Sequence, residues 1–455
     1  MNKDLEGNGG QAKEREEQKL KEFSLDDFKA MLAGGKLYDG RNISSVRFID
    51  PKDLQKTKKF IQDPNFASQR RTLALRLKLL KQLLSKASSH EDAKGKAEQL
   101  AKKASELLKK NLGEVSEKTR DLERRYRTFA LLIANAQTDP NEKLKVTVLN
   151  ADQAELFEPD SDGMKKLGKE IQNYGEYADY KDDAYGLLVI PGDHYRKEHL
   201  GLLGTLCKNS RCFLITDALA TEKGLREPED YLDQLEMDQH KSIPNKSHES
   251  RHFIVTVNEA IGREKEPEYE DEDVYLPASA ALAGMIIRTD NEEGPHVTPA
   301  GEIKGDVRGA ARPKIVLNAR EHGLMREMGL VPLASPKGTL RFMGARSLCT
   351  AEEFKFFAIS RVYDMICNVL QNFAKSIQFR NFDGPLRHRI EQSIMDFLRT
   401  LRGPGRPLRE FSRLEVYEDT STGEAGIVRV KVELTFNMPI DKVLFDLPVK
   451  FREEG

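Results

Sequence analysis

The sequence predicts a mixed α/β protein in which a helical N-terminal region, a layered α/β body and a C-terminal β-meander follow one another. Three observations lead to this fold class. Residues 51–137 are rich in leucine and lysine and show no strand periodicity. From residue 145, short apolar runs alternate with helical stretches, which is typical of a buried and largely parallel sheet. Near the C-terminus, apolar and polar residues alternate strictly, as in half-buried strands.

The N-terminus divides into a polar tail and one short helix. Residues 1–22 are charged and poor in apolar residues, which predicts disorder. Ser24 then opens a sequence similar to a capping box, with Asp in place of the usual Glu or Gln. The helix that follows would bury Leu25, Phe28 and Leu32. A helix this short is marginal alone, so it either packs on a partner or serves as a detachable handle.

The helical region carries lysines that could suggest nucleic-acid binding. Lys102, Lys103, Lys109 and Lys110 are interleaved with glutamates and have no aromatic neighbours for base stacking. A solvated helix face explains them better. A short strand is also predicted at residues 47–49.

The α/β body is predicted from four apolar runs. These buried strands are expected at residues 146–149, 186–190, 211–215 and 253–257. Two long polar insertions, residues 218–251 and 262–273, are expected at the surface. A helix of small residues follows at residues 278–287.

Two amphipathic helices come next, each with one apolar stripe that predicts packing on the other or on the meander. The stripes consist of Ile359, Val362, Ile366, Leu370, Phe373 and Ile377, and of Leu386, Ile390, Ile394, Phe397 and Leu401.

The meander is expected to contain strands at residues 414–417, 428–436 and 443–451. A three-stranded sheet has open edges, which present unpaired N–H and C=O groups to other chains. Pro439 and Pro448 blunt these edges in part, whereas the strand at 428–436 has no proline. The sheet is completed either within its own subunit or by strands of neighbouring subunits. The residues that would form the inter-subunit linkage are Val428, Val430, Val432, Leu434, Phe436, Val443, Phe445, Leu447 and Val449.

Composition excludes several classes of function. The 73 basic and 74 acidic residues give a net charge of −1, so there is no overall field to attract nucleic acid or anionic lipid. The four cysteines form no metal-ligand or disulfide pattern, and Cys207 and Cys212 are expected to be reduced core thiols. The sequence shows neither a signal peptide nor a membrane-spanning apolar run, which predicts a cytoplasmic protein without direct membrane insertion.

No motif assigns catalysis, a cofactor or a metal. Residues 163–170 almost spell a phosphate-binding loop, but Glu170 replaces the hydroxyl that would bind Mg²⁺, and the segment has a helical pattern. His194 and His199 are wrongly spaced for zinc, and His322 and His388 are isolated. Three acids, Asp182, Asp183 and Asp193, bracket the end of a predicted strand. They leave open the alternative of an α/β enzyme with acids near Asp193.

Several stretches in order resemble contractile sheath proteins, above all the large sheath subunit of type VI secretion systems. These are residues 185–193, 321–333 (ending Gly-Leu-Val-Pro-Leu), 338–348, Arg361 and residues 406–408. Ala278, Ala283, Gly284, residues 288–290, Gly294, Pro299 and Ala300 are similar to phage tail sheaths. The resemblance covers residues 185–451 and, more faintly, 49–84. The chain has no tryptophan, which type VI large subunits usually carry, so a phage-tail-like or extracellular one-component sheath remains an alternative.

The resemblance implies a structural protein without enzymatic activity or cofactor. Copies would stack in helical rings around an inner tube on a baseplate, with terminal strands paired to neighbouring protomers and to a small sheath subunit. An AAA+ unfoldase would pull on an N-terminal helix, for which Leu25, Phe28 and Leu32 are the candidates. The expected regions are a flexible N-terminus (1–40), a helical region (41–140), the sheath body (141–350, with insertions in 218–273) and a linkage region (351–455).

Overall fold

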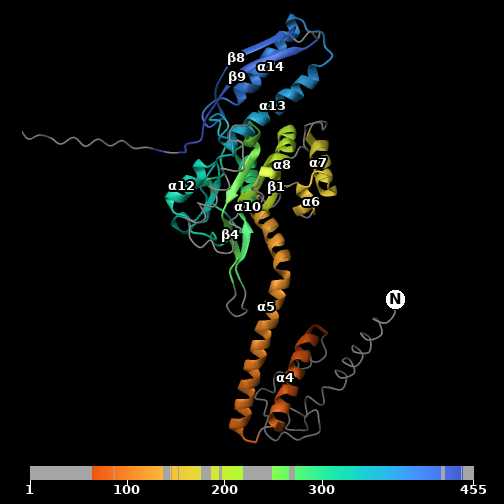
Figure 1. Cartoon of the computed structure of the whole chain (residues 1–455), viewed down its shortest axis with the longest axis vertical. Helices are drawn as coiled ribbons and strands as arrows, with labels where there is room; N and C mark the ends of the chain where they lie inside the picture. The colour runs from red at the N-terminus through yellow and green to blue at the C-terminus, as the bar shows by residue number, and fades with distance from the viewer. Residues whose placement is uncertain are drawn as a thin grey trace, which may run out of the picture. The chain divides into compact units, whose positions relative to one another are not determined.

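The computed structural model describes residues 64–86, 88–136, 144, 146–151, 153–175, 186–193, 197–218, 248–265, 272–421, 426–441 and 443 (Figure 1). The chain separates into two compact units, Met1–Lys110 and Asn111–Gly455, whose boundary falls inside helix α5. The predicted helix at 25–32, the predicted strand at 47–49 and nearly all of the predicted strand at 443–451 lie outside the described residues. In the part of the chain that is described, no helix is both long and apolar enough to cross a membrane.

The first unit is helical where it is described. It contains the short 3₁₀ helix η2 (Pro64–Phe66), helix α4 (Ala67–Lys86) and the beginning of α5 (His90–Ala136). Asp92 accepts a hydrogen bond from Ser88 N at 2.8 Å and from Lys96 Nζ at 2.7 Å, while Lys96 Nζ also reaches Lys86 O at 2.8 Å. These bonds close the turn between α4 and α5.

The second unit is built around a five-stranded sheet with the order β1-β2-β3-β6-β7. The strands are β1 (Leu187–Asp193), β2 (Phe213–Ala218), β3 (Phe253–Val257), β6 (Val331–Ala334) and β7 (Arg341–Phe342). The first four run parallel, and β7 is antiparallel to β6. The sheet therefore confirms three of the four predicted strands and their parallel arrangement.

The fourth predicted strand, residues 146–149, is wrong. The segment has no regular secondary structure, and Val146, Val148 and Leu149 are 42%, 71% and 39% exposed. A β-forming apolar run becomes a strand only if it pairs with a sheet edge and buries its side chains. The described sheets do not include this run, and its side chains are exposed.

Helices cover both faces of the sheet. Alternate residues of β2 point to opposite faces: Phe213 and Ile215 join the core that contains α10 (Ala278–Glu292), and Leu214 joins the core that contains α7 (Asp162–Gly175) and α8 (Lys197–Ser210). Helix α12 (Ala319–Glu327) belongs to the second core through Met325. The P-loop-like stretch lies inside α7, as its helical pattern predicts.

Shorter elements complete this unit. Strands β4 (Glu259–Arg263) and β5 (Val274–Pro277) form a separate antiparallel pair, so the predicted insertion at 262–273 begins inside a strand. The remaining short helices are α6 (Gln153–Phe157), η3 (His248–His252), α11 (Gly301–Lys304) and η5 (Pro336–Gly338).

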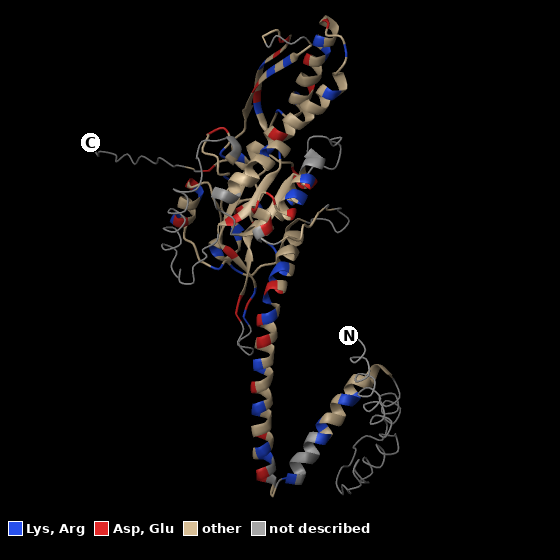
Figure 2. Cartoon of the chain, turned by 45° about the vertical axis from the view of Figure 1, so that its right-hand side comes forward, with Lys and Arg blue, Asp and Glu red and all other residues tan. Residues whose placement is uncertain are grey.

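Ion pairs fasten the C-terminal part of α5 to β4, β5 and their surroundings. Figure 2 shows that acidic and basic residues alternate along this helix. Glu123 pairs with Arg263 at 2.8 Å and Arg120 pairs with Glu272 at 2.8 Å. Further along, Leu131, Leu132 and Ala136 of α5 enter the core beside α10. The helix is thus held by charge at one end of this segment and by apolar packing at the other.

The C-terminal helices and strands have a core of their own (Figure 1). Helices α13 (Phe357–Ile377) and α14 (Gly384–Thr400) pack with the antiparallel strands β8 (Leu408–Glu418) and β9 (Val428–Phe436). Val362, Ile366, Ile390, Ile394 and Leu398 are buried between them. Both predicted helices, and their packing against each other and the strands, are confirmed.

Candidate functional site

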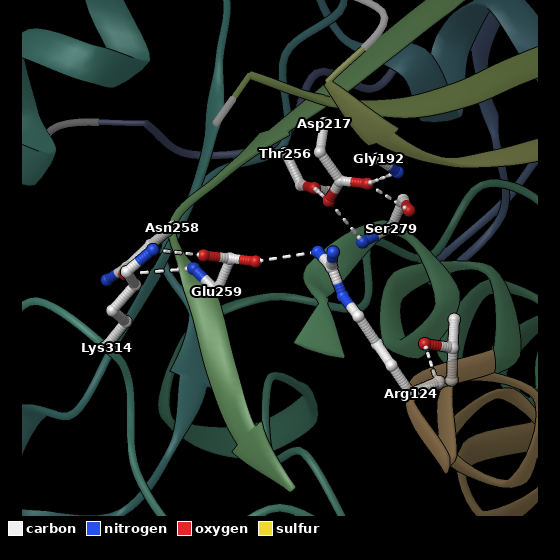
Figure 3. A network of polar contacts seen from close by, with 9 residues as sticks. Arg124, Gly192, Asp217, Thr256, Asn258, Glu259, Ser279 and Lys314 are labelled. Carbon is white, nitrogen blue, oxygen red and sulfur yellow. Dashed lines mark hydrogen bonds and ion pairs between the residues drawn. The ribbon is translucent and has the colours of Figure 1, made fainter. Parts of the chain in front are cut away.

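The carboxyl ends of β1, β2 and β3 are the place where an α/β enzyme would keep its catalytic acids. The acid that the structure places there is Asp217, at the end of β2 (Figure 3). Its carboxylate accepts hydrogen bonds from Gly192 N at 2.9 Å, Thr256 Oγ1 at 2.5 Å, Ser279 N at 2.8 Å and Ser279 Oγ at 2.5 Å. Asp217 therefore joins β1 and β3 to the first turn of α10.

Burial raises the pKa of Asp217 to about 6, against the opposing effect of the hydrogen bonds from Gly192, Ser279 and Thr256. The carboxylate also lies at the N-terminus of α10, where the helix dipole favours negative charge. With each oxygen accepting two hydrogen bonds, this acid is a structural cap for α10.

Of the three acids named from the sequence, one falls within the described residues. Asp193 pairs in backbone register with Asp217, whereas Asp182 and Asp183 lie outside the described residues. In the described ranges, no three His, Cys, Asp or Glu side chains are grouped so that they could hold a metal ion. Sequence reasoning missed Asp217, although a single acid at the end of the apolar run 213–216 was a usable signal.

A second polar network lies close by (Figure 3). Asn258 follows β3 with a left-handed backbone (φ 81°), and its side chain donates to Ile315 O at 2.8 Å and to Leu333 O at 2.9 Å. The next residue, Glu259, is almost fully buried and pairs with Arg124 of α5 at 2.9 Å and with Lys314 at 2.5 Å. These contacts tie α5 to the edge of the body and serve the fold.

Polar contacts also join α13 to the body. Asp364 of α13 pairs with Arg251 at 2.7 Å and with His252 at 2.8 Å, and the Arg251 guanidinium lies 4.8 Å from the ring centroids of both Phe354 and Tyr363. The adjoining cavity of about 320 Å³ is lined by Lys208, Arg251, His252, Phe354 and Tyr363.

Arg361 of α13 pairs with Asp290 of α10, which brings together two of the positions on which the sheath resemblance depends. The C-terminal helices are thereby fixed to the sheet.

The β8–β9 pair is the remaining candidate for a functional site. Its main feature is the two outer edges of its sheet. Strand β8 has 11 residues and β9 has nine, and among the described residues they form a sheet of only two strands. In such a pair, alternate residues of each strand direct their N–H and C=O groups outward. Among the described residues no further strand pairs with either edge, although Leu408 at the start of β8 forms an isolated bridge with Arg402.

The side chains of this sheet follow the predicted alternation. Val428, Val432, Leu434 and Phe436 pack on the core of α13 and α14, while Val430 is 39% exposed. Strand β8 begins six residues before the predicted 414, because Arg409, Glu410 and a bulge between Ser412 and Glu415 interrupt the apolar pattern. Of the other predicted linkage residues, Val443 is 61% exposed and lies in no strand, and Phe445, Leu447 and Val449 fall outside the described residues.

Two family models match the chain. Residues 114–350 match the family model for the type VI secretion system TssC/VipB central domain, and residues 356–454 match the TssC/VipB-like C-terminal domain. No curated protein matches the chain.

Structure comparison finds similarity to solved sheath proteins at low sequence identity. The helical sheath of the anti-feeding prophage in its contracted state is 15% identical, with 70% of this chain and 81% of that chain covered and a TM-score of 0.47. The contracted sheath complex of the PVC extracellular contractile injection system is 16% identical, with 59% and 71% covered and a TM-score of 0.44. A sheath tail protein from Listeria innocua is 13% identical, with 56% and 57% covered and a TM-score of 0.35.

The first family model alone spans more than half of the chain, and the second covers the α13–β9 region with the segment that follows it. The chain belongs to the TssC/VipB family, the large subunits of the contractile type VI secretion sheath.

Proposed function

We propose that the outer edges of β8 and β9, together with the segment that follows β9, pair with strands of neighbouring subunits and hold the contractile sheath together. The two long edges of the β8–β9 sheet support this. Each added backbone hydrogen bond contributes only about 1 kcal/mol net, but a strand forms several of them at every junction of a polymer. The residues assigned to the linkage are Val428, Val430, Val432, Leu434, Phe436, Val443, Phe445, Leu447 and Val449.

Backbone pairing suits a sheath that changes length. Subunits stacked in helical rings around an inner tube, on a baseplate, would rotate as rigid bodies during contraction. The strand pairs between subunits would persist during this rotation. Their backbone hydrogen bonds depend on the alignment of the strands and hardly on the side chains that contact the neighbouring subunit. The assembly would work in the cytoplasm and would push the tube through a target membrane.

A small sheath subunit would bind the exposed apolar stripe of α5. Val115, Leu122, Tyr126 and Phe129 are 56%, 71%, 72% and 44% exposed, although they are apolar and recur at spacings of seven, four and three residues. This spacing is typical of a helix–helix seam. The opposite face of α5 carries Arg124 and Leu131, which contact the body. The stripe therefore supports a helical partner, whereas a one-component sheath would cover it with a second copy.

The N-terminal helix with Leu25, Phe28 and Leu32 would serve as the handle for an AAA+ unfoldase that recycles contracted sheaths. This assignment and the division of the chain at residues 40, 140 and 350 stay predictions.

The test of strand linkage is a deletion of residues 442–455 in the full chain, co-expressed with a candidate small sheath subunit. Sheaths are collected by sedimentation and counted by negative-stain electron microscopy. We expect a soluble subunit with an unchanged thermal midpoint and no tubes. Normal tubes from the shortened chain would contradict the proposal.

The α5 stripe is tested by Leu122→Asp and Tyr126→Asp. Both should abolish co-purification of the small subunit, because a charge would have to be buried in the helix seam. Asp121→Lys, an exposed position off the stripe, is the matched control and should leave co-purification unchanged.

A further inference from the structure

We infer that Arg326 and Arg346 form an arginine cradle that anchors the chain after β9 through Asp441, and so fix the point from which the linking segment leaves the body. This inference rests on the strand linkage proposed above and adds to it a positioning site. Nothing in the local sequence around Asp441 indicates it, because both arginines are distant in the chain.

The cradle holds one carboxylate between two guanidinium groups. Arg346 Nη2 pairs with Asp441 Oδ2, and Arg326 Nη1 lies 3.7 Å from Asp441 Oδ1. The side chains of Arg346, Arg326 and Asp441 are only 18%, 24% and 20% exposed, respectively. Solvent and salt therefore screen this contact less than they screen an ion pair at the surface.

The cradle has a rigid base. Gly329 follows α12 with a left-handed backbone (φ 83°), and a Cβ atom there would fall 2.8 Å from Ser347 O. A Cβ atom on Gly344 would fall 2.9 Å from Pro332 Cδ. Only glycine permits these approaches, which bring the stretches 329–333 and 344–348 together and place Arg326 beside Arg346. Leu348 N donates to Phe253 O at 3.1 Å, which fixes the second stretch to the central sheet.

The charge balance favours a bound carboxylate. Both guanidinium groups pair with the Asp441 carboxylate, and Glu352 is a further acid whose pKa the charge of Arg346 helps to lower. The Nε atoms of Arg326 and Arg346 are both buried without a hydrogen-bond partner among the described residues. Without Asp441, two partly buried cations would face each other and lose a shared counter-charge.

A second attachment lies just before the cradle. Asn437 N donates to Pro407 O at 2.9 Å, and Asn437 Nδ2 donates to Arg406 O at 2.8 Å. The chain is thus held at both ends of the short span from Asn437 to Asp441. Within and just after this span, Met438, Ile440 and Val443 are 47%, 83% and 61% exposed. The anchored backbone therefore presents apolar side chains outward, as a strand does before it pairs with a neighbouring subunit.

Charge reversal with rescue tests the cradle. Asp441→Arg and Arg346→Asp should each lower the yield of sedimented sheath by about tenfold or more, the equivalent of about 1.4 kcal/mol at one junction. The double variant again places two arginines around one acid and should restore at least half of the wild-type yield. Glu302→Lys, which breaks the exposed pair with Lys337, is the control and should keep the wild-type yield.

The outcomes separate this inference from the proposal on which it rests. If the deletion of residues 442–455 still assembles, the strand linkage itself fails. If that deletion abolishes sheaths while Asp441→Arg and Arg346→Asp assemble normally, the cradle alone is wrong. The cradle would also be overturned if the double variant fails to restore assembly although thermal unfolding shows that each variant subunit is folded. Arg346→Gln provides a milder variant in case Arg346→Asp fails to fold, and it should lower the yield in the same direction.

Discussion

Gly284 of α10 lies directly against the backbone of α5: a Cβ atom built on Gly284 would fall 2.3 Å from the carbonyl oxygen of Leu132. The same atom would lie 2.9 Å from the Cβ of Asn135. Neither neighbour can move away cheaply, because one is backbone and the other belongs to a buried residue.

Gly284→Ala should therefore lower the free energy of unfolding by about 2 kcal/mol, since overpacking outweighs the gain in helix propensity. Urea denaturation of the full chain measures this. Gly201→Ala in α8 is the matched control, because no atom lies within 4 Å of its Cβ position. It should raise the stability by about 0.5–1 kcal/mol. Equal effects at the two sites would refute the close contact.

Asp217 should give the stability a characteristic pH dependence. Its pKa is raised from 3.8 to about 6 in the folded protein, so between these values the folded state binds one more proton than the unfolded state. Stability should then fall as pH rises from about 4 to about 6, and this contribution should stay constant above that range, with a total of up to about 3 kcal/mol.

Asp217→Asn removes this titration. In the variant, the amide NH₂ group would replace one carboxylate oxygen that accepts a backbone N–H in the wild type, so the variant should be less stable. The loss of stability should be larger at pH 4.5 than at pH 7, because the titration of Asp217 stabilises the wild type at the lower pH. Chemical denaturation of both proteins across this range measures the difference. If the difference in free energy of unfolding between wild type and variant is the same at every pH from 4 to 7, Asp217 does not titrate in that range.

Glu259 should control how firmly α5 is attached. Glu259→Gln weakens the contacts with Arg124 and Lys314 and should cost about 2 kcal/mol, because its carboxylate is almost fully buried. Hydrogen exchange of the backbone amides around residue 124 should become faster. Glu264→Gln, directly after the end of β4, is the control: its side chain is 62% exposed, and its pair with Arg312 should contribute less than about 0.5 kcal/mol. If the two variants lose the same free energy of unfolding, the burial of Glu259 does not strengthen its contacts with Arg124 and Lys314.

The thiols should differ in reactivity. Burial raises the pKa of Cys207 to about 12 and that of Cys212 well above its usual value, so neither forms a thiolate in the folded protein. A disulfide reagent at pH 8 should react first with the half-buried Cys367 and reach all four cysteines only after unfolding. Cys367→Ser should remove the fast phase. A fast reaction that persists in this variant would contradict the order.

Elements with a local residue pattern could be predicted from the amino-acid sequence. Strict alternation predicted β9 with its correct ends, and apolar stripes predicted α13 and α14, because one buried face imposes a fixed period on neighbouring residues. The same reasoning failed at residues 146–149, where an exposed apolar run joins none of the described sheets, and at the start of β8, where charged residues interrupt the apolar pattern of a strand.

The polar contacts between distant segments depend on the three-dimensional fold. Asp217 and Ser279 are 62 positions apart, and Arg346 and Asp441 are 95 apart, so no periodicity connects them. Such pairs depend on the order of the strands and on close approaches at Gly329 and Gly344, which many residues determine together. For this reason β9 could be predicted from the sequence, whereas the contact of Arg326 and Arg346 with Asp441 could not.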